Sequence, residues 1–249
     1  MTNSKSLSFI IPTYKQENTI LNDIKRLQKS LETLSLKYEI LVIADGHLQT
    51  VSKIVSKIKD KRVKVVGYEK NKGKGFAVRY GMLEAGGDII GFIDAGMDLD
   101  PTEIPLMLDI MDWNKADIVI GSKLHPDSKV DYPMFRKVLS WGYRTLTHIL
   151  FGFKVRDTQV GLKLFKKKAA KGIFSRIIIK RFAFDIEVLA VASKLGYHKI
   201  YEAPIKLNFK QNTISSLNFW RTIFWMLWDT AAVFYRLRFL HYYDKNRNN

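Results

Sequence analysis

The sequence Ile-Ile-Gly-Phe-Ile-Asp-Ala-Gly-Met-Asp-Leu-Asp, residues 89–100, joins a short apolar run to three carboxylates. The apolar part predicts a buried strand, and Asp94, Asp98 and Asp100 follow where that strand should end. Ligands of open α/β sheets bind beyond the carboxyl ends of the strands. Carboxylates there suit Mg²⁺ or Mn²⁺, which usually take one or two of them together with substrate phosphates. The alternative is an acidic loop that only caps the next helix.

The segments on either side of this stretch alternate between strand and helix patterns. Apolar runs predict strands at residues 7–11, 38–43, 63–66, 88–93 and 117–120. Helical spacing predicts helices at residues 19–34, 51–58, 75–85 and 103–111. This alternation indicates an α/β fold with a mostly parallel sheet. The regularity then breaks, and we expect a helix at 133–150, a strand at 161–165, a helix at 184–195 and an extended segment at 200–209.

The composition limits the classes of partner. The chain has 249 residues, 47% of them apolar, which is enough for one large domain with an appendage. Its net charge of +17 favours polyanionic partners such as nucleic acid, anionic lipid or phosphorylated substrates. We find no RNA- or DNA-reading motif and expect no specific nucleic-acid partner. The absence of cysteine excludes disulfides and thiolate metal sites, and fits a reducing compartment.

Both ends of the chain bear on contact with a membrane. Residues 1–6 lack the apolar region of a secretory signal, and no uninterrupted apolar run reaches about 18 residues, so we expect no signal peptide and no simple membrane span. In the segment 216–240, five polar residues fall within about 100° of a helical wheel, and much of the remaining surface is apolar. These polar residues are Asn218, Arg221, Thr222, Asp229 and Arg236.

This pattern, with three tryptophans at Trp220, Trp225 and Trp228, favours a helix that lies in a membrane interface. A helix packed on the domain or in a dimer is the alternative. We therefore divide the chain into a main α/β domain, residues 1–215, and an amphipathic helix with a basic tail, residues 216–249. The sequence does not predict the oligomeric state.

Polar loops follow each of the first five predicted strands. They occupy residues 12–17, 45–46, 71–75, 94–100 and 121–123. Loops at one edge of a sheet bring Asp45, two lysines and the acidic segment together, a composition that suits a nucleotide with a diphosphate and a metal. The glycine-rich loop 71–75 could let the backbone approach a phosphate and opens a helix, although a plain turn explains it equally well.

Three further motifs occur in a recognisable order. They are Asn71-Lys72-Gly73-Lys74-Gly75 with Val78-Arg79-Tyr80-Gly81-Met82, then Asp157-Thr158-Gln159-Val160-Gly161-Leu162-Lys163-Leu164-Phe165, then Phe182-Ala183-Phe184-Asp185-Ile186-Glu187. In these motifs the chain resembles glycosyltransferase family 2, which has the nucleotide-diphospho-sugar transferase (GT-A) fold. The resemblance covers residues 7–243 and is strongest to the dolichyl- and polyprenyl-phosphate glycosyltransferases, in the β-glucosyltransferase and mannosyl synthase branch.

The resemblance implies a role for each matching position. It assigns Pro12, Tyr14, Glu17 and Asp45 to a nucleoside pocket, Lys74 to the diphosphate or the base side, and Asp94 and Asp98 to a metal site. It assigns Lys123 and Arg136 to the acceptor phosphate, and Asp157 and Gln159 to the transferred sugar. Asp94, Asp157 and Gln159 are thus the expected catalytic residues, and Mg²⁺ or Mn²⁺ is the expected cofactor.

One departure from the family pattern concerns the metal. The family usually has Asp-x-Asp after the fourth strand, whereas Gly96 stands at the second acidic position here and supplies no side-chain oxygen. Asp98 matches a position that also ligates metal in some relatives, so Asp94 and Asp98 could still hold the ion with substrate oxygens. A weakened metal site or an inactive homologue is the alternative.

The expected reaction is an inverting transfer of a hexose from a nucleotide diphosphate sugar to a polyprenyl or dolichyl phosphate, at the cytoplasmic face of a membrane and without a membrane span. UDP-glucose is the favoured donor, and GDP-mannose stays open. A phosphate monoester has a second pKa of about 6 and needs no strong general base, so Asp157 is expected to position the sugar. The alternatives are a transferase that acts on a soluble glycan hydroxyl, and a catalytically degenerate sugar-nucleotide-binding homologue.

Overall fold

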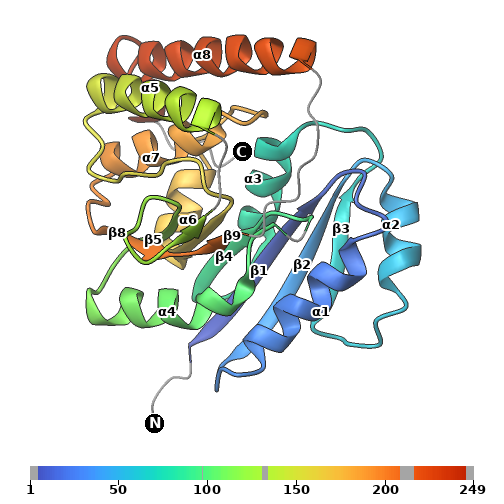
Figure 1. The fold of residues 1–249 in the computed structure, drawn as a ribbon. Helices are drawn as coiled ribbons and strands as arrows, with labels where there is room; N and C mark the ends of the chain where they lie inside the picture. Colours follow the sequence, from blue (N-terminus) through green and yellow to red (C-terminus); the bar gives the residue numbers. More distant parts are fainter. Residues whose placement is uncertain (1–4, 97, 131–133, 208–215, 245–249) are drawn as a thin grey trace.

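A seven-stranded sheet forms the centre of the molecule, which we describe from a computed structural model (Figure 1). The structure describes residues 5–96, 98–130, 134–207 and 216–244, without the side chains of 130, 134–138 and 216–220. The strand order is β3-β2-β1-β4-β7-β5-β8. The strands are β1 (Ser6–Thr13), β2 (Lys37–Asp45), β3 (Val63–Tyr68), β4 (Ile89–Ile93), β5 (Ile118–Ser122), β7 (Leu162–Lys166) and β8 (Ile200–Pro204). Only β7 runs antiparallel to its neighbours in this sheet.

Helices cover both faces of the sheet. One face packs against α1 (Ile20–Leu31), α2 (Leu48–Val55) and α4 (Ile104–Trp113). The other face packs against α3 (Lys74–Glu84), α6 (Lys167–Phe174) and α7 (Phe184–Lys194). Strand residues alternate between the two cores: Ile10 points into one, and Phe9 and Ile11 into the other. This layered α/β arrangement confirms the predicted fold class.

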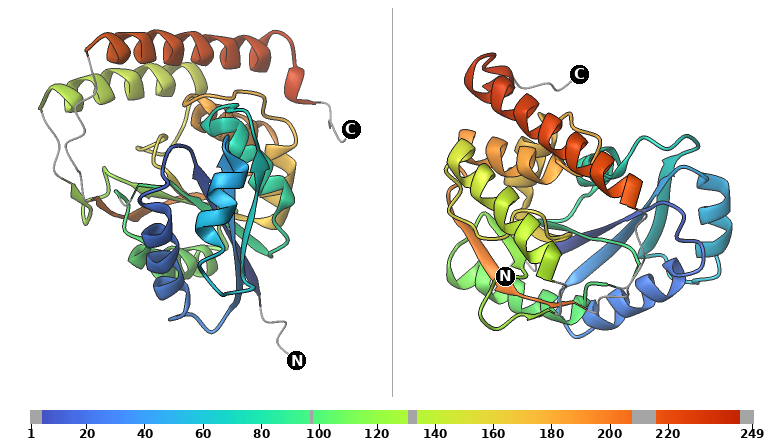
Figure 2. Two further views of the ribbon diagram at one scale, coloured as in Figure 1. Left: turned by 90° about the vertical axis from the view of Figure 1, so that its right-hand side faces the viewer. Right: turned by 45° about the horizontal axis from the view of Figure 1, so that its top comes forward.

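Two long helices, α5 (Met134–Phe151) and α8 (Ser216–Arg238), lie side by side as an outer layer beyond α7 (Figures 1 and 2). A hydrogen bond of 2.7 Å joins the hydroxyls of Tyr143 in α5 and Thr230 in α8. Val233 of α8 is fully buried in the core that α3, α6 and α7 share. The helix at 216 begins where the sequence predicts it, and the division of the chain at residue 215 stays a prediction.

The remaining elements are short. A two-stranded sheet pairs β6 (Lys129–Val130) with β9 (Lys206–Leu207), and the 3₁₀ helices η1 (Pro101–Glu103) and η2 (Tyr242–Asp244) precede α4 and follow α8. The extended segment predicted at 200–209 divides into β8 and β9, and its last two residues lie outside the described part. Helix α6 was not predicted, because it has only eight residues, begins with two lysines and buries only four apolar side chains.

No helix among the described residues is long and apolar enough to cross a membrane. The outer layer nevertheless exposes large apolar side chains. They are Trp141, Leu146 and Ile149 on α5, Phe224, Leu227, Trp228 and Tyr235 on α8, and Phe239 and Leu240 just after it. We call this set the outer apolar surface. Two of the five polar residues predicted on one side of this helix, Asp229 and Arg236, are only partly exposed. The side chains of residues 216–220 are not described, so the amphipathic character of the whole helix stays a prediction.

Candidate functional site

A cavity of about 430 Å³ opens at the carboxyl ends of β1, β2 and β4. The ends of these strands, the loops after β1, β3 and β4, helix α3 and the segment before α7 line it. The lining residues are Pro12, Thr13, Tyr14, Gln16, Asp45, Asn71, Gly73, Lys74, Ala77, Asp94, Ala95, Arg181 and Phe182. The structure thus brings five of the predicted site residues together: Pro12, Tyr14, Asp45, Lys74 and Asp94. Glu17 lies one residue beyond Gln16 and is not among the lining residues.

Asp94 is the first residue after β4 and is held firmly on its backbone side. Its N–H donates to the carbonyl of Gly161 at 2.8 Å. A Cβ on Gly161 would lie 1.8 Å from Oδ2 of Asp94, so only a glycine leaves room for the carboxylate in this position. Oδ2 accepts a hydrogen bond from Nζ of Lys74 at 2.7 Å, whereas Oδ1 is buried and has no hydrogen-bond partner among the described residues.

Lys74 begins α3, directly after Gly73 with φ +98°. A Cβ on Gly73 would approach the carbonyl oxygen of Lys180 to 2.4 Å, so glycine is needed here for space as well as for φ. Burial opposes the charge on the Lys74 ammonium, but the carboxylates of Asp94 and Asp185 outweigh it and raise the pKa of Lys74 above its usual value. The lysine is therefore a permanent cation in the cavity wall.

Asp185 lies behind this lysine, at the start of α7, and only 4% of its side chain is exposed. It forms a buried ion pair with Lys163 of β7, whose Nζ also donates to the carbonyl of Val160 at 2.6 Å. Burial raises the pKa of Asp185, against the opposing effect of the lysines. Four charges of alternating sign thus connect the cavity to the core: Asp94, Lys74, Asp185 and Lys163. No role was assigned to Asp185 from the sequence, and the structure places it next to Lys74 of the cavity wall.

Asp45, at the end of β2, organises the glycine-rich loop. Its carboxylate accepts hydrogen bonds from the side-chain amide of Asn71 at 2.8 Å, the N–H of Lys72 at 2.7 Å and the N–H of Gly73 at 3.0 Å. Only 2% of the residue is exposed. The carboxylate therefore fixes the loop that carries Lys74, and the contact with a nucleotide base that the resemblance implied stays a prediction.

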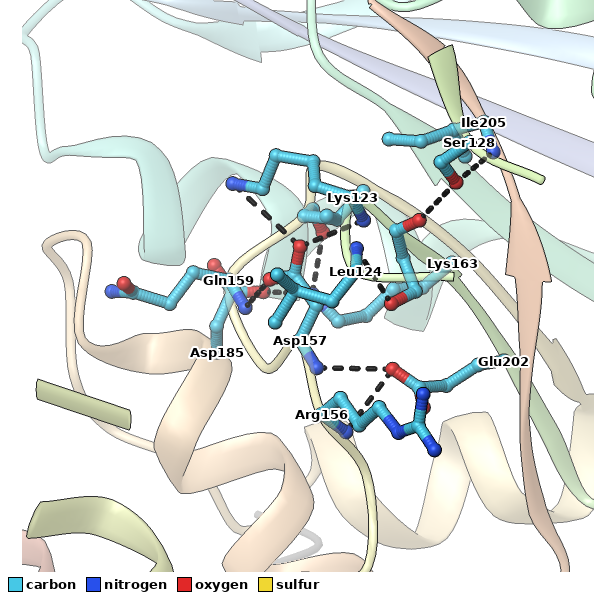
Figure 3. Close-up of polar contacts among 12 residues, drawn as sticks. Lys123, Leu124, Ser128, Arg156, Asp157, Gln159, Lys163, Asp185, Glu202 and Ile205 are labelled. Carbon is cyan, nitrogen blue, oxygen red and sulfur yellow. Dashed lines mark hydrogen bonds and ion pairs between the residues drawn. The ribbon is translucent and has the colours of Figure 1, made fainter. Parts of the chain in front are cut away.

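A second group of predicted residues surrounds Asp157 (Figure 3). Oδ2 of Asp157 accepts from the N–H of Lys123 at 2.9 Å and lies 3.8 Å from its Nζ, and Oδ1 accepts from the N–H of Gln159 at 3.2 Å. Glu202 of β8 accepts from the N–H of Asp157 at 3.0 Å. The side chain of Gln159 extends away from the Asp157 carboxylate. None of these residues lines the cavity, but the segment 157–161 runs directly from this group to Gly161 and Asp94.

The residues for a metal fit in part. Asp94 lines the cavity, and its Oδ1, which has no hydrogen-bond partner among the described residues, is a hard oxygen ligand. The described residues contain no cluster of three His, Cys, Asp or Glu side chains, so substrate oxygens would have to complete the coordination shell. Gly96 has φ +109° and its N–H donates to Asp23 at 3.1 Å, which makes it a turn residue. Asp98 is half-buried outside the cavity lining, and the side chain of Arg136, in α5, lies outside the described residues.

Sequence reasoning missed Arg181 and Phe182 as cavity residues. Arg181 stacks on the ring of Trp225 of α8 at 4.0 Å, and its Nε lies 3.6 Å from Oδ2 of Asp229. It therefore links the cavity wall to the outer helix. Its position directly before the motif that begins at Phe182 was the available signal, but no local pattern shows that the loop before α7 folds back onto the glycine-rich loop.

The sequence comparisons agree with this geometry. Residues 8–174 match the family described as "Glycosyl transferase family 2". The chain belongs to glycosyltransferase family 2. It is 32% identical over 257 residues to the human dolichyl-phosphate beta-glucosyltransferase, with 95% of this chain and 76% of the human protein covered. The Saccharomyces cerevisiae dolichyl-phosphate beta-glucosyltransferase is 29% identical over 80% of this chain and 66% of its own length.

Solved structures confirm the fold of this family member. Glucosyl-3-phosphoglycerate synthase from Mycobacterium tuberculosis, crystallised with Mn²⁺, UDP and phosphoglyceric acid, matches with a TM-score of 0.68 at 17% identity, over 93% of this chain and 78% of that one. Mannosyl-3-phosphoglycerate synthase from Rubrobacter xylanophilus matches with a TM-score of 0.70 at 15% identity, over 94% and 74%. Both share the GT-A-like arrangement of a mostly parallel sheet between helices.

Proposed function

We propose that the chain transfers glucose from UDP-glucose to a dolichyl or polyprenyl phosphate, with inversion at the anomeric carbon. The cavity at the ends of β1, β2 and β4, with the adjacent Lys74 and Asp94, is the observation that carries this proposal. Family membership supports the reaction class, and the relatives named dolichyl-phosphate beta-glucosyltransferase support the sugar and the acceptor. The GDP-mannose alternative gains no support from these relatives.

The charges in the cavity suit a sugar nucleotide. Tyr14 is 43% exposed at the cavity wall and offers an aromatic surface to the nucleoside, beside Pro12. Lys74 offers a point charge to the diphosphate, where negative charge grows as the glycosidic bond breaks. Asp94, with Asp98 and the substrate oxygens, would hold Mg²⁺ or Mn²⁺, which when bound supplies Lewis-acid stabilisation of the leaving diphosphate.

The group around Asp157 is assigned to the acceptor side. Lys123 presents a cation whose side chain is 26% exposed, and Asp157 fixes the backbone on which this lysine stands. We assign Lys123 and Arg136 to the acceptor phosphate, and Gln159 to the transferred sugar. Since the phosphate is largely dianionic at neutral pH, it attacks without losing a proton to the enzyme. Asp157 then acts by positioning these groups.

A transfer assay separates the candidate reactions. The chain is incubated with radiolabelled UDP-glucose or GDP-mannose, Mn²⁺, and either dolichyl phosphate or a soluble oligosaccharide, and the products are resolved by thin-layer chromatography. The proposal expects label in the lipid fraction from UDP-glucose alone. Label in the oligosaccharide would favour the hydroxyl-acceptor alternative, and no transfer with any pair would favour the degenerate homologue.

We further propose that the outer apolar surface contacts the membrane that carries the acceptor, at its cytoplasmic face. Side chains such as Trp228, which is 61% exposed, gain free energy when they leave water at a lipid interface, and basic residues such as Arg238 next to them favour anionic lipids.

Vesicle sedimentation tests this contact. Replacement of Phe224 and Trp228 by Ser is expected to reduce binding to anionic vesicles at least about tenfold, with UDP binding unchanged, since each removes more than about 1 kcal/mol of apolar burial. Trp113, which is 73% exposed on α4 at the opposite face of the sheet, is the matched control, and its Ser variant should bind vesicles normally. If the Phe224 and Trp228 variant bound vesicles as well as the Trp113 variant does, or if the protein formed a dimer without lipid, the membrane contact would be contradicted.

A further inference from the structure

The carboxylate of Asp94, the candidate metal ligand, already forms an ion pair with the ammonium of Lys74. Nζ of Lys74 lies 2.7 Å from Oδ2 of Asp94, within ion-pair distance. The side chains are only 22% and 32% exposed, so the pair is partly shielded from water. A charge-assisted hydrogen bond of this length contributes more free energy than a neutral one. Any divalent ion that binds Asp94 must compete with this lysine or be repelled by it.

The second oxygen of the same carboxylate is left unsatisfied. Oδ1 of Asp94 is buried and lacks a hydrogen-bond partner among the described residues, which is costly for a carboxylate oxygen. Gly161 closes one side of the carboxylate, because its Cα lies so near that a Cβ there would overlap Oδ2. The carboxylate therefore cannot turn toward Gly161 to find another donor. Oδ1 of Asp94 can therefore accept a second cation, although the ammonium of Lys74 already neutralises part of the charge of the carboxylate.

A second carboxylate favours the charged form of Lys74 when its ammonium moves away from Asp94. Its ammonium also lies in the field of Asp185, which is buried and is held in place by Lys163. Its four-carbon stem starts at the first residue of α3, so the ammonium can swing without any change in the backbone. An anionic ligand that enters the cavity would offer it new oxygen acceptors in place of Asp94.

We propose that Lys74 is the resident cation of the metal site, and that its transfer from Asp94 to the diphosphate of the donor couples metal binding to donor binding. The inference rests on the proposed donor site. In the free protein Lys74 pairs with Asp94, and a divalent cation alone binds weakly. When the diphosphate draws Lys74 away, both oxygens of Asp94 become available to the metal. Because coupling between two ligands is reciprocal, the metal must raise the affinity for the diphosphate by the same factor.

The test measures Mn²⁺ binding from the loss of the free-ion signal in electron paramagnetic resonance, with and without UDP-glucose, after correction for the Mn²⁺ that the nucleotide binds by itself. The wild-type protein should bind Mn²⁺ at least about tenfold more tightly when UDP-glucose is present, which corresponds to about 1.4 kcal/mol of coupling. Lys74→Met removes the resident cation. This variant should bind Mn²⁺ alone about tenfold more tightly than the wild type, and UDP-glucose should improve that binding less.

Lys72 provides the matched control, because it stands two residues earlier in the same loop. Its Nζ lies 4.8 Å from the ring centre of Tyr68 and 4.6 Å from that of Phe76, and it does not line the cavity. Lys72→Met removes the same charge from the chain, so its Mn²⁺ affinity should match the wild type. Lys74→Arg keeps the cation and should also bind Mn²⁺ alone weakly. If the Met variant does not fold, Lys74→Gln removes the charge but keeps a donor for Asp94, and the same tenfold gain is expected.

The outcomes separate the two proposals. If the wild type binds neither UDP-glucose nor Mn²⁺ in their joint presence, the donor site itself is wrong. If the wild type binds both, but Lys74→Met binds Mn²⁺ alone no more tightly than the wild type, the donor site stands and the role of Lys74 as resident cation is overturned. Equal gains for Lys74→Met and Lys72→Met would overturn it too, since the effect would then come from total charge.

Discussion

Gly161→Ala is expected to disable the site from a position that touches no substrate. The new Cβ would stand 1.8 Å from Oδ2 and 2.0 Å from Cγ of Asp94. A normal contact is about 3.5 Å, so the carboxylate must retreat by roughly 1.5 Å. This movement breaks the 2.7 Å hydrogen bond from Lys74. A misplacement of about 1 Å can cost about 100-fold in rate, and overpacking costs about 1 to 3 kcal/mol of unfolding free energy.

The measurements are the transfer rate from UDP-glucose to dolichyl phosphate and the free energy of unfolding in urea. Gly142→Ala is the control, because nothing lies within 4 Å of a Cβ at this exposed position in α5. It should leave the rate unchanged and stabilise the protein by about 0.5 to 1 kcal/mol.

A double-mutant cycle with Asp94→Ala isolates the contact. Without the carboxylate, the alanine at position 161 has nothing to overlap, so Gly161→Ala should cost little stability in that background. Wild-type rate and stability in Gly161→Ala, or the same loss of stability with and without the carboxylate of Asp94, would refute the reasoning.

Three further substitutions test other parts of the account. Gly96→Asp restores the family's acidic motif but places a side chain at φ +109°, so it should cost about 1 to 3 kcal/mol of unfolding free energy and bring no gain in Mn²⁺ affinity; tighter binding would contradict this. Lys163→Met leaves Asp185 buried without its ion-pair partner and should lower the free energy of unfolding in urea by about 3 to 5 kcal/mol. An unchanged free energy of unfolding would show that the ion pair is dispensable. The N–H and hydroxyl of Ser6 hold the pKa of Asp88 below 3.8, so its ionised form stabilises the protein above about pH 4, and this contribution is lost as the pH falls through the folded-state pKa. Asp88→Asn should therefore be less stable than the wild type at pH 7, with a difference that shrinks as the pH falls below the ordinary carboxyl pKa of 3.8. A difference that stays constant with pH would argue against the assignment.

The sequence predicted those parts of the fold that depend on local pattern. The run at 89–93 is a strand because five consecutive apolar residues are buried on both faces, as β4 shows. The loop that follows it carries Asp94 into the cavity, as expected for the carboxyl end of a parallel strand. The predicted strand at 161–165 lies within one residue of β7.

The direction of β7 could not be predicted. It runs antiparallel between β4 and β5, although every other neighbouring pair in the sheet is parallel. Strand direction depends on the path of the connections before and after the strand, and no periodicity encodes that path. The position of this strand brings Gly161 against Asp94 and Lys163 against Asp185. Because the direction of β7 could not be predicted, neither of these two contacts could be predicted from the sequence.

The sequence also did not show which groups each carboxylate of the site contacts. Asp45 was predicted to bind the nucleoside and does line the cavity, but its carboxylate accepts hydrogen bonds from the loop that carries Lys74. Asp157 likewise accepts from the backbone at Lys123 and Gln159. A carboxylate that organises a loop and one that binds a ligand have the same sequence signature. Only their hydrogen-bond partners distinguish them.

A crystal structure of the chain with UDP-glucose and Mn²⁺ tests the central claim most directly. The account predicts the diphosphate in the cavity lined by Lys74 and Asp94, with Nζ of Lys74 on a phosphate oxygen and the Mn²⁺ on the carboxylate of Asp94. A nucleotide bound elsewhere, or a diphosphate in the cavity with Lys74 still paired to Asp94 and no metal between them, would contradict it.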